Sequence, residues 1–187
     1  MNAVDEIKFT RVWGMPSADT FDCEPIKGFV QKYLMQSKVS VDPFSRNKRW
    51  DKYTNDLNPD TAADYHMEAF EFLDWMHGNL VRPDLIIFDP PYSLTQVARS
   101  YQDIGLKFKG NENPTGGFPK VRNLIAKMLD VNGVCLSFGW NSCGIGKTNG
   151  FEILEILLVC HGGNHQDTIC VAERKVQPHP ELSLLSQ

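Results

Sequence analysis

The segment Leu85-Ile86-Ile87-Phe88-Asp89-Pro90-Pro91-Tyr92 decides the fold class. Its first four residues are continuously apolar, which is typical of a parallel strand buried on both faces. The two prolines have no N–H to donate and cannot continue a central ladder, so the strand must end at Phe88. The segment therefore predicts the central strand of an α/β domain, followed by a rigid turn that places a carboxylate, free carbonyls and an aromatic ring at the sheet edge.

Strand-like and helix-like segments alternate around this strand, which predicts one α/β domain over residues 1–176 and a polar tail over residues 177–187. Only six residues separate the last two strands, too few for a crossover helix, so we expect an antiparallel hairpin at the end of a mostly parallel sheet. Residues 61–76 fit one long helix or a short strand followed by a helix, and we prefer the second interpretation. The expected strands are Lys38–Asp42, Tyr53–Asp56, Tyr65–Met67, Val134–Phe138, Glu152–Cys160 and Asp167–Glu173, and the expected helices are Ile26–Leu34, Ala69–Met76 and Pro119–Leu129.

Three of the expected strands end in an acid: Asp42, Asp56 and Asp89. In open α/β sheets, ligands bind in the crevice outside the carboxyl ends of the strands. Acids repeated at that edge indicate a binding site. The alternative is that an aspartate before proline or asparagine only shapes a turn.

The composition indicates a soluble, cytoplasmic protein. The 187 residues carry a net charge of −4, include 42% hydrophobic residues, contain no apolar run of membrane-spanning length and do not begin with a signal peptide. The five cysteines are odd in number and three lie in strand-like runs, which favours reduced thiols. Cys160, His161, His165 and Cys170 include no paired CxxC spacing, so we expect no metal site.

Basic charge is concentrated in two segments that are predicted to be loops. Residues 45–53 and residues 93–122 each carry a net charge of +3, whereas the remaining 148 residues carry −10. Such a distribution is expected where a protein contacts a polyanion. Solvated surface loops are the alternative interpretation.

Asp89-Pro90-Pro91-Tyr92 after a hydrophobic strand resembles the signature of adenine-N6 DNA methyltransferases that use S-adenosylmethionine, and the chain is most similar to the small orphan enzymes of bacteriophages. Val41-Asp42-Pro43-Phe44 resembles the start of that family's first cofactor motif, and Thr54-Asn55-Asp56-Leu57-Asn58-Pro59 the second. Met67-Glu68-Ala69 is similar to the segment that contacts the cofactor's adenine, and Phe9 to Leu34, with Thr20-Phe21, to the segment that closes over its methionine end.

The resemblance implies a Rossmann-like class I methyltransferase sheet and a reaction that passes a methyl group from S-adenosylmethionine to the N6 amine of a flipped adenine in duplex or single-stranded DNA. It also implies a bacterial or phage-infected host cell. Expected catalytic residues are Asp89, Pro90, Pro91 and Tyr92; expected cofactor contacts are Asp42, Pro43, Phe44, Asp56, Asn58, Glu68, Thr20 and Phe21; expected phosphate contacts are Arg46, Lys48, Arg49, Arg99, Lys107, Lys109, Lys120 and Arg122.

Two departures from the family pattern affect these expectations. The first cofactor motif continues into Ser45-Arg46-Asn47-Lys48-Arg49-Trp50, which lacks the glycines that permit a positive φ. The cofactor is then expected either to bind weakly or to depend more on Asp56, Glu68 and the N-terminal segment. No segment is long enough for a separate target-recognition domain, so base specificity is expected to come from loops or a partner, or hardly to exist. A homodimer or a partner subunit is the expected form of association.

Other interpretations stay open. Trp140 after the fifth strand either forms a second aromatic wall for the target base or caps the core. Gly144 to Thr148 lacks the first glycine of a phosphate-binding loop, which argues against nucleotide hydrolysis. An RNA adenine methyltransferase and a binding protein that has lost catalysis are the alternative functions.

Overall fold

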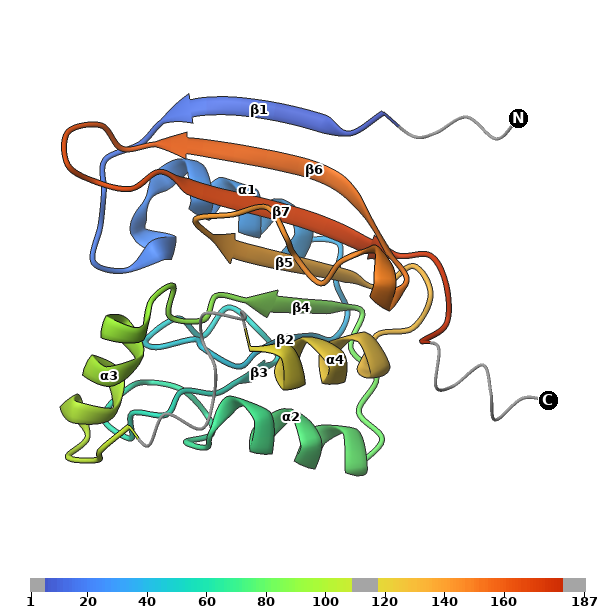
Figure 1. Ribbon diagram of the computed structural model, residues 1–187. Helices are drawn as coiled ribbons and strands as arrows, with labels where there is room; N and C mark the ends of the chain where they lie inside the picture. Colours follow the sequence, from blue (N-terminus) through green and yellow to red (C-terminus); the bar gives the residue numbers. More distant parts are fainter. Residues whose placement is uncertain (1–5, 109–117, 180–187) are drawn as a thin grey trace.

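The computed structural model describes residues 6–108 and 118–179, which form one sheet with helices on both faces (Figure 1). The strand order is β1-β6-β7-β5-β4-β2-β3. All neighbouring strands are parallel except β7, which is antiparallel to both β5 and β6. The prediction of a Rossmann-like, mostly parallel sheet with a C-terminal antiparallel hairpin is therefore confirmed. The strands are β1 Lys8–Trp13, β2 Ser40–Asp42, β3 Tyr53–Thr54, β4 Leu85–Phe88, β5 Val134–Gly139, β6 Phe151–Cys160 and β7 Thr168–Lys175.

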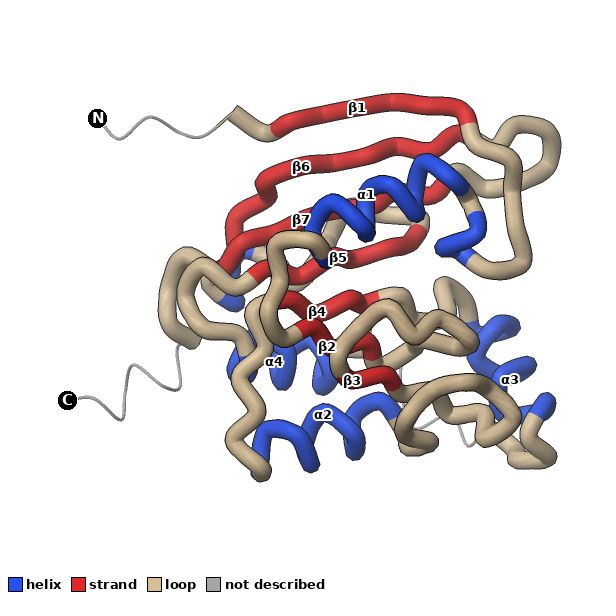
Figure 2. The backbone as a smooth tube through the Cα atoms, turned by 180° about the vertical axis from the view of Figure 1, so that it is seen from behind, coloured by secondary structure: helices blue, strands red, loops and turns tan. Residues whose placement is uncertain are grey.

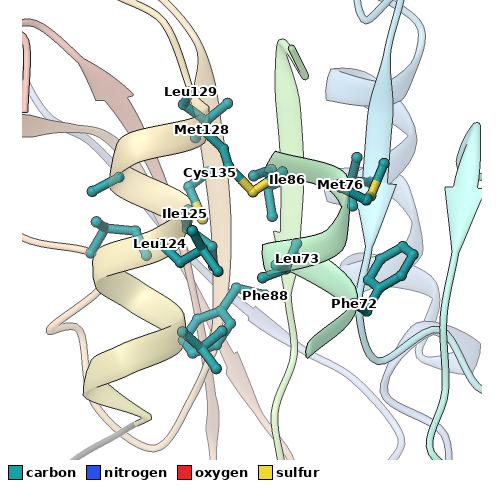
Figure 3. Close-up of a cluster of buried hydrophobic side chains, with 14 of the residues drawn as sticks. Phe72, Leu73, Met76, Ile86, Phe88, Leu124, Ile125, Met128, Leu129 and Cys135 are labelled. Atoms are coloured by element: carbon teal, nitrogen blue, oxygen red, sulfur yellow. The ribbon is translucent and has the colours of Figure 1, made fainter. Parts of the chain in front are cut away.

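Strand β4 lies at the centre of the core and is buried along its whole length. Leu85 and Ile87 pack on the face covered by helix α1, Glu24–Leu34, which Figure 2 shows from behind. Ile86 and Phe88 pack on the opposite face, under α2, Ala69–Gly78, and α4, Pro119–Met128. Figure 3 shows side chains of α2 and α4 meeting over Ile86 and Phe88. The turn after β4 is therefore fixed by a strand that packs on both sides.

Two described elements were not predicted. Helix α3, Leu94–Asp103, occupies part of the segment that was predicted to be a loop, so that prediction was wrong. Strand β1 lies in the segment that was expected only to close over the cofactor. The expected strand Tyr65–Met67 is reduced to a single parallel bridge between Asn55 and Tyr65. Two short 3-10 helices, η1 at Thr20–Asp22 and η3 at Lys147–Asn149, complete the described elements.

The predicted polar tail begins with residues that pack on the domain. His179 is 3% exposed and lies 3.4 Å from Asn123, measured from Nε2 to Nδ2. The Gln177 N–H donates to the Gly150 carbonyl at 3.2 Å. Residues 180–187 lie outside the described part of the chain. No helix within the described residues is long and apolar enough to cross a membrane.

A buried lysine fixes the C-terminal end of α4. Lys175 on β7 is 2% exposed, and its Nζ donates to the carbonyls of Ala126 and Leu129. Such carbonyls at a helix end have no partner within the helix. Burial lowers the pKa of the Lys175 ammonium, so its hydrogen bonds offset a desolvation penalty.

We expect Lys175→Met to lower the free energy of unfolding by about 1–3 kcal/mol, because two buried carbonyls lose their donor. Lys120→Met, which changes an exposed lysine in the first turn of α4, serves as the control and should change stability by less than about 0.5 kcal/mol. Urea unfolding followed by circular dichroism measures both. A Lys175→Met protein as stable as the wild type would contradict this role.

Candidate active site

A cavity of about 570 Å³ opens at the carboxyl edge of strands β2, β3 and β4. This volume lies within the range of small-molecule and cofactor sites. Its walls come from the turns after these strands, from the segment before η1 and from α3. Twelve of the predicted site residues line it: Thr20, Pro43, Phe44, Arg46, Asp56, Asn58, Glu68, Asp89, Pro90, Pro91, Tyr92 and Arg99. The structure thus brings together segments that are far apart in the sequence.

The turn after β4 is held by hydrogen bonds among its own side chains and those of α3. The Tyr92 hydroxyl donates to Asp89 Oδ1 at 2.5 Å. The Tyr92 N–H donates to Gln96 Oε1 at 2.6 Å, while Ser93 Oγ accepts the Gln96 N–H at 3.2 Å and caps α3. This reciprocal arrangement is close to a capping box. Helix α3 therefore holds the Asp89–Tyr92 turn rigidly against the cavity.

The electrostatics of this turn are set by burial. Burial raises the pKa of Asp89 to about 6, although hydrogen bonds from Tyr92 and Thr20 act to lower it. Burial and the neighbouring Asp89 charge raise the pKa of the Tyr92 phenol. At neutral pH, Asp89 is therefore an ionised acceptor that holds the protonated Tyr92 hydroxyl. The Tyr92 ring meets Trp140 edge to face, with centroids 5.8 Å apart.

Arg46 adopts the positive φ that the glycine-poor turn after β2 requires. Its φ is +50°, in the left-handed region that costs a non-glycine residue about 1–3 kcal/mol. Two hydrogen bonds offset that cost: the Arg46 N–H donates to Asp56 Oδ2 at 3.1 Å, and Nη1 donates to the Ala18 carbonyl at 2.7 Å. Arg46 thereby joins the turns after β2 and β3 to the segment before η1.

Two further acids face the cavity from neighbouring turns. Asp56 Oδ1 accepts the Asn58 N–H at 2.8 Å. Glu68, at the start of α2, accepts a hydrogen bond from the Tyr101 hydroxyl of α3 at 2.6 Å. Tyr101 was missed from the sequence because α3 was not predicted. The Ser93 cap with Gln96 three residues later was the signal that could have located this helix.

Asp42 and Phe21 are not among the residues that line the cavity, and their contact with the cofactor stays a prediction. Asp42 is 1% exposed, and its Oδ1 turns inward to accept the Phe44 N–H at 2.8 Å. Phe21 is buried between Trp50, with centroids 5.9 Å apart, and Phe138, at 5.2 Å. Both residues support the cavity from behind.

The predicted phosphate contacts divide into separate groups. Arg46 and Arg99 line the cavity. Lys48 is paired with Asp22 and Arg49 with Asp64, so two cations of the first basic segment are engaged within the protein. Lys107 and Lys120 are exposed, Arg122 is partly buried and Lys109 lies outside the described residues. Contact of these side chains with nucleic acid stays a prediction.

Comparison with known proteins identifies no family: no family model and no curated protein matches the chain. Similar solved structures include SMU.776, described as a candidate methyltransferase complexed with SAH (14% identity, TM-score 0.49), and TrmN from Thermus thermophilus (13%, 0.49). The matches cover 78% and 81% of this chain but 48% and 49% of those proteins, so the chain spans about half their length. HI0767 from Haemophilus influenzae, described as a candidate methylase, matches at 11% identity and a TM-score of 0.46 over 87% of this chain and 92% of its own.

A buried pair of carboxylates lies behind the cavity. Asp42 Oδ2 and Asp51 Oδ1 are buried without a hydrogen-bond partner. Burial, followed by the Asp51 charge, raises the pKa of Asp42, and burial raises the pKa of Asp51 to about 7. Because both carboxylates are desolvated and the Asp51 charge disfavours ionisation of Asp42, the folded protein keeps a proton on the pair below about pH 7.

These raised pKa values make the free energy of unfolding depend on pH. Between the ordinary aspartate pKa and about 7 the folded state binds more protons than the unfolded state, so stability falls as pH rises through this window. We expect Asp51→Asn to raise the melting temperature by a few degrees at about pH 8 and by a clearly smaller amount at about pH 5. Scanning fluorimetry at both pH values measures this, with exposed Asp60→Asn as the control. Equal pH dependence of stability in the wild type and Asp51→Asn would show that Asp51 does not hold this proton.

Proposed function

We propose that the protein is an S-adenosylmethionine-dependent methyltransferase that acts on the exocyclic N6 amine of adenine in DNA. The observation that carries this proposal is the Asp89-Pro90-Pro91-Tyr92 turn at the cavity. It presents an ionised carboxylate, a backbone carbonyl and an aromatic ring on one rigid support. A flat ring for stacking and acceptors for amine hydrogens are what an extruded adenine requires.

The donor set of the cavity fits S-adenosylmethionine, which when bound supplies the methyl group. Asp56, after β3, and Glu68, at the start of α2, offer carboxylate acceptors for sugar hydroxyls and the adenine amine. Phe44, Met67 and Phe118 supply apolar wall for a flat ring. Because Tyr101 holds Glu68 from α3, the cofactor wall and the Asp89 turn share one helix.

Substrate positioning requires Tyr92 to exchange its partner. In the present structure its hydroxyl occupies Asp89 Oδ1, the oxygen that the target amine would use. On arrival of adenine, the amine would donate to Asp89 and to the Pro90 carbonyl, and the Tyr92 ring would stack on the base. Trp140, 43% exposed and edge-on to Tyr92, borders this position and supports its role as a second aromatic wall. Orienting the amine lone pair in this way is catalysis by positioning.

DNA is the proposed polymer because Tyr92 follows the two prolines, as in the DNA enzymes that the sequence resembles. Arg46 and Arg99 place positive charge at the cavity mouth, where a phosphate backbone would pass. The test is transfer of a labelled methyl group to unmethylated duplex DNA, single-stranded DNA and RNA, with the product nucleoside identified by mass. Methyladenine found in RNA alone would show that RNA, and not DNA, is the substrate. The absence of methyl transfer to all three polymers would refute the proposed activity.

We expect Asp89→Ala to reduce methyl transfer by at least about a hundredfold, because the amine loses its charged acceptor. The fold should persist, since the carboxylate lies in a turn and not in the core. Circular dichroism and calorimetric titration with S-adenosylmethionine distinguish a lost reaction from a lost fold or lost cofactor binding. Asp74→Ala, an exposed acid on α2, is the matched control. Transfer by Asp89→Ala at the wild-type rate would refute the assignment.

The pH dependence of the rate should report the same carboxylate. Because Asp89 accepts hydrogens only when ionised, kcat/KM should fall about tenfold per pH unit below about pH 6 and level off above it. Asp89→Asn should have a lower rate whose kcat/KM does not fall below about pH 6, because asparagine does not ionise. A wild-type profile that is flat across about pH 5–8 would show that ionisation of Asp89 is not required.

A further inference from the structure

Strand β1 is a free edge of the sheet and carries large apolar side chains. It is six residues long, whereas β3 at the opposite edge has two. Phe9 and Trp13 are 62% and 67% exposed, and Ile7 just before the strand is 48% exposed. Proteins usually blunt a free edge with charged side chains, proline, a bulge or a very short strand, and of these β1 has two charges, Lys8 and Arg11. The β1 sequence contains no proline, and its register with β6 is continuous from Lys8 to Trp13.

The exposed side chains point to the face of the sheet opposite α1. Val12 packs against the cluster under α1, and Lys8 pairs with Glu155, which also binds Lys32 of α1. Because side chains alternate along a strand, Phe9, Arg11 and Trp13 point to the other face. Figure 1 shows α2 and α4 over the β4–β2 half of the sheet. Among the described helices, none covers this face of β1 and β6.

The backbone of β1 also has groups directed away from the sheet. The Gly14 N–H donates to the Cys160 carbonyl of β6 at 3.1 Å. Since N–H and C=O directions alternate along a strand, Val12, Thr10 and Lys8 bond toward β6, and Phe9, Arg11 and Trp13 direct their N–H and C=O groups outward. These outward groups can pair with another strand.

We propose that β1 pairs antiparallel with β1 of a second copy of the chain, about a twofold axis that passes between the two Thr10 residues. This register places Phe9 opposite Arg11 of the second copy, and Ile7 opposite Trp13. Because both members of each of these pairs direct their backbone groups outward, the pairs are hydrogen-bonded. Each Phe9 then lies opposite an arginine, and each Trp13, whose indole packs over Gly162 of its own subunit, lies opposite an isoleucine.

Other antiparallel registers are less favourable. A shift that pairs Arg11 with Arg11 of the second copy puts like charges directly opposite, which destabilises a sheet. A shift that pairs Phe9 with Phe9 leaves Trp13 without a described partner. Registers shifted by one residue place outward groups against inward ones and form no ladder. Among these registers, only the Thr10 register avoids like charges opposite each other, gives both aromatic side chains a described partner and forms ladder hydrogen bonds. The proposed dimer does not depend on the proposed function.

The full chain should sediment as a dimer in analytical ultracentrifugation, and Arg11→Pro should sediment as a monomer. The Arg11 N–H points outward, so proline removes a bond of the dimer but none between β1 and β6. Arg11→Ala, which keeps the N–H, is the matched control and should remain dimeric at high concentration. Thermal melting of each variant checks that the subunit is folded. A monomeric wild type, or a dimer that persists in folded Arg11→Pro, would overturn the proposal.

Cysteine cross-linking tests the register in the same full chain. In a Cys143→Ser background, which removes the exposed cysteine of the described residues, Thr10→Cys should form an intermolecular disulfide on mild oxidation. Residues that face each other in a non-hydrogen-bonded pair lie about 4.5 Å apart between Cα atoms, close enough for a disulfide. Arg11→Cys, directly adjacent in sequence but not on the axis, should cross-link far less. Cross-linking through position 11 in preference to position 10 would overturn this register.

Discussion

Neither Pro90 nor Pro91 has an N–H to donate, so the ladder of β4 ends at Phe88 and the chain leaves the sheet between β2 and β5. Because β4 packs against helices on both faces, the position at which the chain leaves the sheet is fixed. Asp89 is the first residue beyond the ladder, and it lies partly buried at the cavity with a pKa raised by that burial. The chemistry of the site therefore depends on where the central strand is forced to stop.

The walls of the cavity show how a turn without glycine can still be built. Arg46 takes a positive φ, and the strain is offset by bonds from its N–H to Asp56 and from its guanidinium to Ala18. A glycine would adopt the same positive φ without strain, but it has no side chain to hydrogen-bond to the neighbouring segments. The arginine instead connects three segments around the cavity. The cavity can therefore form without glycines in this turn, because side-chain hydrogen bonds hold the backbone conformation that glycine would otherwise allow.

The fold was predictable where hydrophobic runs were long or bounded by strong turn signals. Leu85–Phe88, α2, α4 and the final hairpin were placed within a few residues, because apolar continuity and Asp-Pro or Asn-Gly turns mark them. Strand β1 was missed because an edge strand that is mostly exposed lacks an alternating hydrophobic pattern. Helix α3 was missed although Leu94, Val97 and Tyr101 recur at helical spacing, because only Val97 is buried and the segment was interpreted as a basic loop.

The residues of the candidate site also divide into those that the sequence predicted and those that it could not. The turn Asp89–Tyr92 and the acids Asp56 and Glu68 were predictable, since strand ends can be located from sequence. The inward rotation of Asp42 was not, because it depends on the Phe44 N–H and on Asp51, nine residues later. Tyr101 also required the tertiary structure, since nothing in the sequence indicates that α3 crosses to the start of α2. Contacts between turns are set by packing, which a single sequence does not display.

The bond between Tyr92 and Asp89 gives the proposed reaction a definite resting state. A carboxylate left alone in a partly buried site would pay for desolvation without compensation, and the Tyr92 hydroxyl supplies that compensation before any target arrives. A target amine replaces this donor with its own, so the exchange is nearly balanced in hydrogen bonds. The released ring is then free to stack on the base that displaced it. In the proposed reaction, one side chain would thereby protect the acceptor in the free protein and form a wall of the pocket in the complex.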